Sequence, residues 1–180
     1  MTEVVIWTPR RFDFDQSANT LYENPKNGFL HNYEIKVKRT SLTSGDFLLN
    51  IEWDILEARL KPQCHIVIID SKNLTHCPTE WVNKVCSCAI SFTITHPMKY
   101  LVFYDPDCAL SNEEIEATLN FNQFLNQQIS NLDSYVKLVS HAGASLTPKF
   151  TSSGQLGPPG MKQLARGIMM KVHEIFGSND

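Results

Sequence analysis

The stretch His65-Ile66-Val67-Ile68-Ile69-Asp70 decides the fold class of this 180-residue chain. Its four central residues are all β-branched and apolar, and the run ends in a carboxylate. A continuous apolar run of this length is typical of a strand that is buried on both faces, as in the centre of a parallel sheet. Tyr100 to Tyr104 repeats the pattern and is followed by Asp105. We therefore predict two central parallel strands, each ending in an acid.

Helical patterns lie on both sides of these strands. We expect helices over Ser44 to Leu60, over Pro78 to Phe92, and from Ser111 onward, where Glu114 has the spacing of a capping box. Tyr135 to Val139 predicts a further strand. Strands that alternate with helices in this way indicate βαβ units, and so an α/β fold.

The N-terminal part has a different pattern. Val4 to Trp7 is a short apolar strand, and Asn27-Gly28 is a strong signal for a β-hairpin. Phe29 to Val37 then alternates between apolar and polar residues, as a strand with one wet face does. We therefore expect a mixed sheet, with an antiparallel N-terminal hairpin flank, parallel central strands, and helices packed on the sheet.

The length of the chain fits one α/β domain. We divide it into a hairpin-like part (residues 1–43), an alternating helix and strand core (44–146), a flexible loop rich in Gly, Pro, Ser and Thr (147–160) and a C-terminal amphipathic helix (161–176). The C-terminal helix has the clearest apolar stripe in the chain, with Leu164, Ile168 and Val172 on one face.

The composition argues against several classes of partner. Hydrophobic residues make up 42% of the chain, and the formal net charge is −3, so neither nucleic acid nor an anionic membrane is an expected partner. The N-terminus lacks the pattern of a signal peptide, so we expect the cytoplasm. Five cysteines at irregular spacing indicate reduced thiols, and Cys86-Ser87-Cys88 lacks the spacing of a zinc site. We expect no metal and no cofactor.

A candidate ligand site follows from the predicted parallel strands. Their carboxyl ends carry Asp70 and Ser71, Asp105 and Asp107, and His141. Open α/β sheets bind ligands at this edge. These groups could hold a ligand or support acid–base chemistry through the imidazole. The alternative is structural, because acids at strand ends commonly cap helices and form turns.

Two further features have open interpretations. Lys162, Arg166 and Lys171 lie off the apolar stripe of the last helix, where they form either a docking face for a partner or a solvated surface. Serine catalysis is not indicated, because no G-x-S-x-G motif occurs in the chain. We expect no catalytic residue that the sequence alone can name.

The middle of the chain, Leu30 to Leu132, resembles a STAS domain, the fold of the anti-sigma-factor antagonists. The resemblance is carried by a strand at Tyr33 to Val37 before a helix, by the step from strand to acid to small residue within His65 to Leu74, and by the strand at Tyr100 to Tyr104. It implies a regulatory role. In that family a phosphorylatable serine begins the next helix; the matching stretch here lacks its motif, and Thr79 is the hydroxyl nearest to that place.

These observations lead to two hypotheses. The first is a non-enzymatic regulatory or signalling domain that acts by protein–protein interaction, either with another protein or with itself as a homodimer. The alternative is a small-molecule sensor or an enzyme with its site at the carboxyl ends of the parallel strands.

Overall fold

The computed structural model describes residues 2–8, 33–39, 64–76, 83, 86–87, 89–92, 94, 98–107, 109–129, 135–140 and 158–176. The elements within these residues are, in chain order, β1 (Thr2–Thr8), β2 (Tyr33–Arg39), β3 (Cys64–Ile68), α3 (Ser71–His76), β4 (Tyr100–Asp105), α5 (Asn112–Ile129), β5 (Val136–Ser140) and α6 (Pro158–Phe176).

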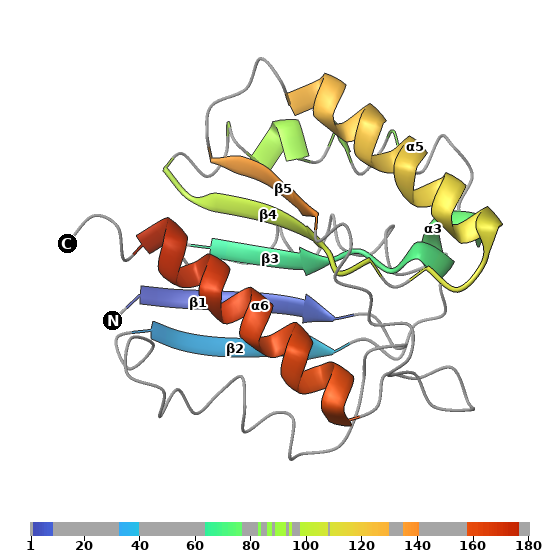
Figure 1. Ribbon diagram of the computed structural model, residues 1–180. Helices are drawn as coiled ribbons and strands as arrows, with labels where there is room; N and C mark the ends of the chain where they lie inside the picture. The colour runs from blue at the N-terminus through green and yellow to red at the C-terminus, as the bar shows by residue number, and fades with distance from the viewer. Residues whose placement is uncertain are drawn as a thin grey trace.

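The strands form one five-stranded sheet in the order β2-β1-β3-β4-β5 (Figure 1). Every pair of neighbours is parallel. The α/β class and the parallel centre of the sheet are therefore confirmed. The order runs outward from β1 in both directions, first to β2 and then from β3 to β5, so the direction of winding reverses between β1 and β3.

The antiparallel N-terminal hairpin is wrong. β2 pairs with β1 in parallel, from Thr2 beside Tyr33 to Thr8 beside Arg39. A parallel pair needs a connection of a dozen residues or more, and residues 9–32 are long enough to supply one. The alternating pattern of Tyr33–Arg39 reflects the place of β2 at the edge of the sheet.

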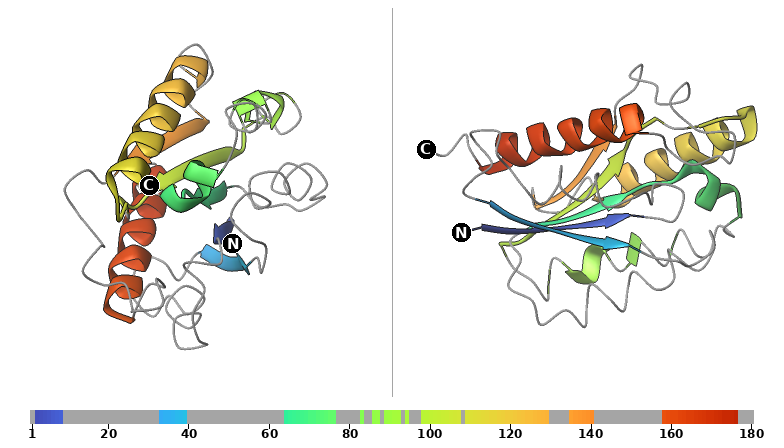
Figure 2. Two further views of the ribbon diagram at one scale, coloured as in Figure 1. Left: turned by 90° about the vertical axis from the view of Figure 1, so that its right-hand side faces the viewer. Right: turned by 90° about the horizontal axis from the view of Figure 1, so that it is seen from below.

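The two faces of the sheet are covered by different helices. Val4 and Ile6 of β1 point to the face on which α6 packs, and Val5 and Trp7 point to the other face. Figure 2 shows α6 along one side of the sheet. The members of the α6 layer are Val4, Ile6, Cys64, Ile66, Ile68, Val102, Tyr104, Leu164, Ile168, Met169, Val172 and Ile175.

The second layer is built on α5, on α3 and on helical residues between 83 and 94. Its largest fully buried side chains include Phe92, Phe103 and Leu125. Burying an aromatic or aliphatic side chain of this kind stabilises the fold by about 1.5–3 kcal/mol. The sheet is thus apolar on both faces, which explains the continuous apolar run that begins at His65.

Two helices differ from the expectation. The sequence pattern predicts an apolar face of α5 through Ile115, Leu119, Leu125 and Ile129. Leu125 is buried as predicted, but Ile115 and Leu119 are exposed, and the buried face runs through Phe121 instead. The loop predicted over residues 147–160 is shortened, because α6 begins at Pro158. Proline is favoured in the first turn of a helix, where its missing N–H has no partner to lose.

Several predicted elements lie outside the described residues. These are the helix over Ser44 to Leu60 and the hairpin turn at Asn27-Gly28. Of the helix predicted over Pro78 to Phe92, the described residues from 83 to 92 are helical. In the part of the chain that the structure describes, no helix is long and apolar enough to cross a membrane.

Candidate functional site at the carboxyl edge of the sheet

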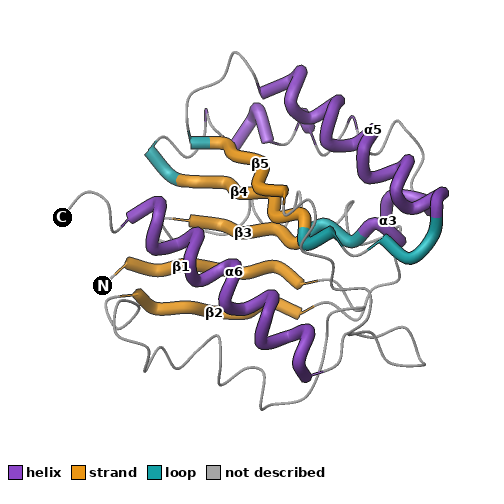
Figure 3. The backbone as a smooth tube through the Cα atoms, viewed as in Figure 1, coloured by secondary structure: helices purple, strands orange, loops and turns teal. Residues whose placement is uncertain are grey.

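The loops that leave β3 and β4 lie at the same edge of the sheet. Figure 3 shows both in teal, running from the strand ends toward α3 and α5. β3 and β4 are parallel, with Ile68 beside Tyr104, so Asp70 and Asp105 follow at nearby levels. The structure thus places two of the predicted acids, Asp70 and Asp105, at one edge.

Asp70 begins the short helix α3. Its Oδ1 accepts a hydrogen bond from the Lys72 backbone N–H at 3.0 Å, and its backbone oxygen accepts one from Leu74 N–H at 3.4 Å. This is the geometry of a helix N-cap, in which a side-chain oxygen satisfies an N–H that has no partner within the helix. α3 was not predicted from the sequence. The feature that could have indicated its start is Asp70, a residue type that commonly caps helices, which is buried here with 4% of its surface exposed.

Ser71 joins this edge to α5. Its side chain is buried, and its Oγ donates to Oε2 of Glu114 at 3.3 Å. The same oxygen of Glu114 accepts the Leu110 backbone N–H at 2.7 Å. Glu114 was predicted only as part of a capping box, and half of that box is present, since its N–H donates to Ser111 Oγ at 3.2 Å. Its carboxylate instead ties α5 to the start of α3.

Asp105 holds three groups at the end of β4. Oδ1 accepts the Asp107 backbone N–H at 2.9 Å. Oδ2 accepts Nδ2 of Asn122 at 3.0 Å and Oγ of Ser140 at 3.2 Å. Because Asn122 belongs to α5 and Ser140 is the last residue of β5, this buried carboxylate fastens three elements together.

The environment of Asp105 affects a neighbouring group. Burial, and then the negative charge of Asp105, raise the pKa of the Tyr104 phenol well above its ordinary value. Tyr104 therefore stays protonated at neutral pH.

The contacts of Asn122 and Ser140 with Asp105 were not predicted from the sequence. A polar residue within a helix pattern and one at a strand end have no special spacing that would reveal them.

Asp107 lies in the turn after β4. Its φ is 56°, in the left-handed region, which Asp tolerates better than most residues. The bond from its N–H to Asp105 completes a local turn of the kind that Asp commonly forms. Asp107 is half-buried, so it is nearer to solvent than Asp105, the buried acid that ends β4.

The other residues predicted from the sequence are described only in part by the structure. His141 and Thr79 lie outside the described residues. Arg166 is exposed on α6, and Lys171 forms an ion pair of 3.1 Å with Glu174. Lys162 lies within α6, but its side chain is not among those described. A ligand role for the strand-end residues and a docking role for the basic face stay predictions.

The strand order shifts the expected centre of a ligand site. In an open α/β sheet, ligands bind outside the carboxyl ends of the strands at the point where the winding reverses, which in the order 2-1-3-4-5 lies between β1 and β3. Trp7 is aligned with Val67, so Thr8, the buried last residue of β1, approaches the edge beside the end of β3. The site predicted from the sequence is centred on β3, β4 and β5 instead.

The described thiols have no reactive setting. Cys64 and Cys86 are free and buried. Burial raises the pKa of the Cys86 thiol to about 12 and that of Cys64 further, so neither forms a thiolate at neutral pH. Among the residues that the structure describes, no group of His, Cys, Asp and Glu side chains has the arrangement of a metal site.

Two solved structures share this fold. One is an acetyl xylan esterase from the rumen bacterium Butyrivibrio proteoclasticus, with a TM-score of 0.61 and 12% sequence identity, matched over 98% of this chain and 64% of its own. The other is a family two carbohydrate esterase from Clostridium thermocellum in complex with cellohexaose, with a TM-score of 0.62 and 8% identity, matched over 97% of this chain and 65% of its own.

No protein-family model matches the chain, and no curated protein matches it. The chain spans less than two thirds of the length of either esterase. Neither neighbour is a STAS domain, and the resemblance of Leu30 to Leu132 to that family stays a prediction. The expectation of a non-enzymatic regulatory or signalling domain is corrected, because the neighbours that share the fold over nearly the whole chain are enzymes. The chain has the α/β fold of these carbohydrate esterases.

Proposed function

We propose that this chain binds a small molecule at the carboxyl edge of its sheet, where β1 and β3 lie side by side, and that the reaction it supports is hydrolysis of a carbohydrate ester. The observation that carries the proposal is the reversal of winding between β1 and β3, since such a reversal creates a crevice outside the strand ends. The reaction class is suggested by the two esterases with the same fold.

The side chains at this edge favour an uncharged, polyhydroxylated ligand. Among those that the structure describes, the buried ones are Thr8, Asp70, Ser71 and Asp105, none of which is basic, and the basic side chain beside them, Lys72, is exposed. Buried carboxylates repel an anionic ligand such as a phosphate ester, whereas hydroxyl and carboxylate oxygens suit the hydroxyl groups of a sugar. This supports a neutral carbohydrate over a nucleotide.

Ester hydrolysis also needs a nucleophile and a base. His141 follows Ser140 directly in the sequence, and we propose it as the general base of the site. Ser71 is a poor nucleophile, because its side chain is 2% exposed and its Oγ donates to Glu114. Either an activated water molecule or a hydroxyl from the residues that follow β1 would then attack the ester. As a setting, we propose the cytoplasm, which suits the free thiols of Cys64 and Cys86.

The test is acetate release from acetylated xylo-oligosaccharides, with binding followed in parallel by thermal shift. We expect release by the purified chain, and its loss in His141→Ala. Asn126→Asp changes the charge of an exposed residue in the C-terminal half of α5 and should leave release unchanged. Binding without release would reject the esterase and keep the site. Neither binding nor release from any acetylated sugar would overturn both.

A further inference from the structure

The outer faces of α5 and α6 carry opposite charge. α5 contains Glu113, Glu114 and Glu116 and no Lys, Arg or His. α6 contains four basic residues, Lys162, Arg166, Lys171 and His173, and a single acid, Glu174. Of the charged residues that the two helices expose, α5 carries Glu113 and Glu116, whereas α6 carries Arg166 and Glu174, and the charge of Glu174 is balanced by its ion pair with Lys171. Complementary charge on two surfaces steers their association and sets their register.

Both outer faces also expose large apolar side chains. Of the six large hydrophobic residues that are exposed in the described part of the chain, Ile115 and Leu119 lie in the first half of α5, and Leu110 lies just before its start. Ile115 is 46% exposed and Leu119 is 62% exposed; they are four residues apart, so they lie on one side of the helix. A single exposed leucine is ordinary, but an apolar group bordered by charges marks an interaction site.

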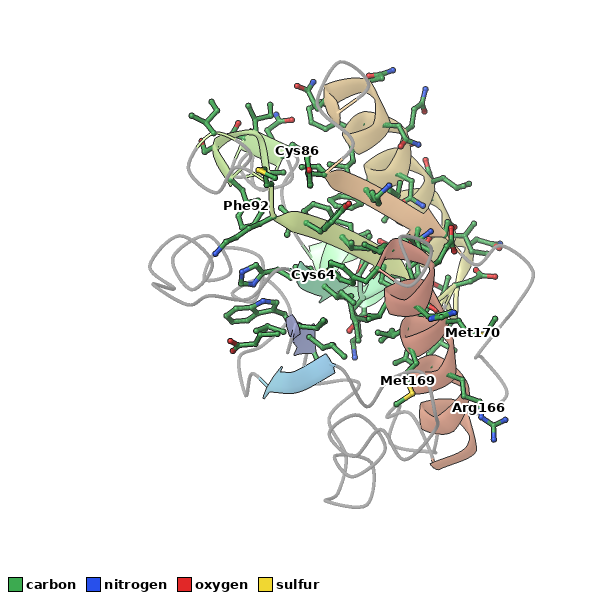
Figure 4. All side chains as sticks on the ribbon, turned by 90° about the vertical axis from the view of Figure 1, so that its left-hand side faces the viewer. Cys64, Cys86, Phe92, Arg166, Met169 and Met170 are labelled. Atoms are coloured by element: carbon green, nitrogen blue, oxygen red, sulfur yellow. The ribbon has the colours of Figure 1, made fainter. Side chains whose placement is uncertain are left out.

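α6 offers the matching surface. Met170 is 68% exposed and lies four residues after Arg166. Figure 4 shows both side chains on the side of α6 that faces away from the sheet. Met169, in contrast, is buried in the core between α6 and the sheet. Methionine is flexible and fills irregular apolar surfaces well. Lys171 already pairs with Glu174, so the contact depends on Arg166.

The two faces cannot meet within one molecule. α6 packs with Ile6 and Ile66 on one face of the sheet, whereas α5 packs with Val67 and Phe103 on the other. The surface that fits the acidic and apolar face of α5 is therefore the α6 of another copy. A contact between two different surfaces of one chain is heterologous, and it produces a ring or an open chain of copies.

We propose that the chain self-associates head to tail, with the outer face of α5 (Leu110, Glu113, Ile115, Glu116 and Leu119) of one copy against the outer face of α6 (Arg166 and Met170) of the next. The pairing places Ile115 and Leu119 on Met170, and Glu116 by Arg166. It uses no residue of the proposed site, so it stands independently of the proposed function.

Sedimentation velocity of the full chain tests the proposal over about 10 µM to 1 mM, which covers dissociation constants in the micromolar to millimolar range. We expect mass that grows with concentration, and a dissociation constant that rises about tenfold between low salt and about 0.5 M NaCl. Arg166→Glu and Glu116→Arg should each abolish the association. A mixture of the two variants should restore it, because each reversed face then meets a face of opposite charge.

The control is Lys72→Glu, which makes the same charge reversal on the exposed part of α3, away from both docking faces, and should leave the self-association unchanged. Leu119→Asn and Met170→Gln should weaken the association at least tenfold without loss of the folded signal in circular dichroism. A chain that is monomeric throughout the range would overturn the proposal. So would an association that survives either single charge reversal, or one that the mixture does not restore.

Discussion

At the scale of single residues, Asp70 stands out because its carboxylate has both a structural contact and a place in the proposed site. It accepts the Lys72 N–H at 3.0 Å and so caps α3. Asn caps a helix about as well as Asp does, whereas Ala cannot accept this bond. The structural and functional contributions of Asp70 are therefore separable by substitution.

We predict that Asp70→Ala lowers the free energy of unfolding by about 1 kcal/mol, and that Asp70→Asn changes it by less than about 0.5 kcal/mol. Urea denaturation measures both. Asp70→Asn should nevertheless weaken ligand binding, since it removes the charge while keeping the cap. If Asp70→Ala and Asp70→Asn lowered the free energy of unfolding equally, capping of α3 would not explain how Asp70 stabilises the fold.

Met98 is the other residue with an unusual backbone. Its φ is 66°, in the left-handed region, which costs a residue with a Cβ about 1–2 kcal/mol relative to glycine. Its side chain is 74% exposed, so replacing it removes little packing. The turn before β4 therefore carries local backbone strain at an exposed position.

We predict that Met98→Gly raises the free energy of unfolding by about 1 kcal/mol. The matched control is Met170→Gly, which places the same substitution at an exposed methionine inside α6 and should lower stability by about 1 kcal/mol, because glycine disfavours a helix. Thermal and urea unfolding of both variants give the comparison. A loss of stability in Met98→Gly would contradict the account.

At the scale of elements, Asp105 joins β4 to α5 and β5 through Asn122 and Ser140. A hydrogen bond to a charged group contributes about 1.5–3 kcal/mol, and less where water can replace it, as at the exposed Ser140 and the half-buried Asn122. The carboxylate of Asp105 therefore stabilises the position of the last residue of β5, after which the chain continues to His141.

We predict that Asp105→Ala lowers the free energy of unfolding by about 2–3 kcal/mol, and Ser140→Ala by about 0.5–1 kcal/mol. In a double-mutant cycle, Ser140→Ala should cost less in the Asp105→Ala background than alone, because the shared bond is already lost. Additive costs would show that the bond between Ser140 and Asp105 contributes nothing.

The elements also show where sequence reasoning succeeded. Runs such as the one at His65 predict buried strands because a parallel strand needs apolar side chains on both faces. The stripe of α6 is confirmed at Leu164, Ile168 and Val172 for a similar reason. The face of α5 was predicted correctly at Leu125 but not at Leu119, because the pattern allows one apolar face through Leu119 and another through Phe121, and only packing on the sheet decides between them.

At the scale of the whole molecule, strand pairing could not be predicted. The pattern of Tyr33–Arg39 fits an edge strand of either direction, and a hairpin signal at Asn27-Gly28 favoured the antiparallel choice. Only the sheet order places β1 between β2 and β3 and moves the expected site toward Thr8. The acids at Asp70 and Asp105 were predictable from the strand ends, but their hydrogen-bond partners come from distant elements.

The central claim is that a ligand binds at the carboxyl edge beside β1 and β3. The most direct measurement is the change in backbone amide NMR shifts when an acetylated xylo-oligosaccharide is added to the full chain. We predict changes at Thr8 and over Ile69 to Lys72, with none at Tyr100, which begins β4 at the opposite edge. Changes that appear at the opposite edge, or no change at saturating ligand, would contradict the account.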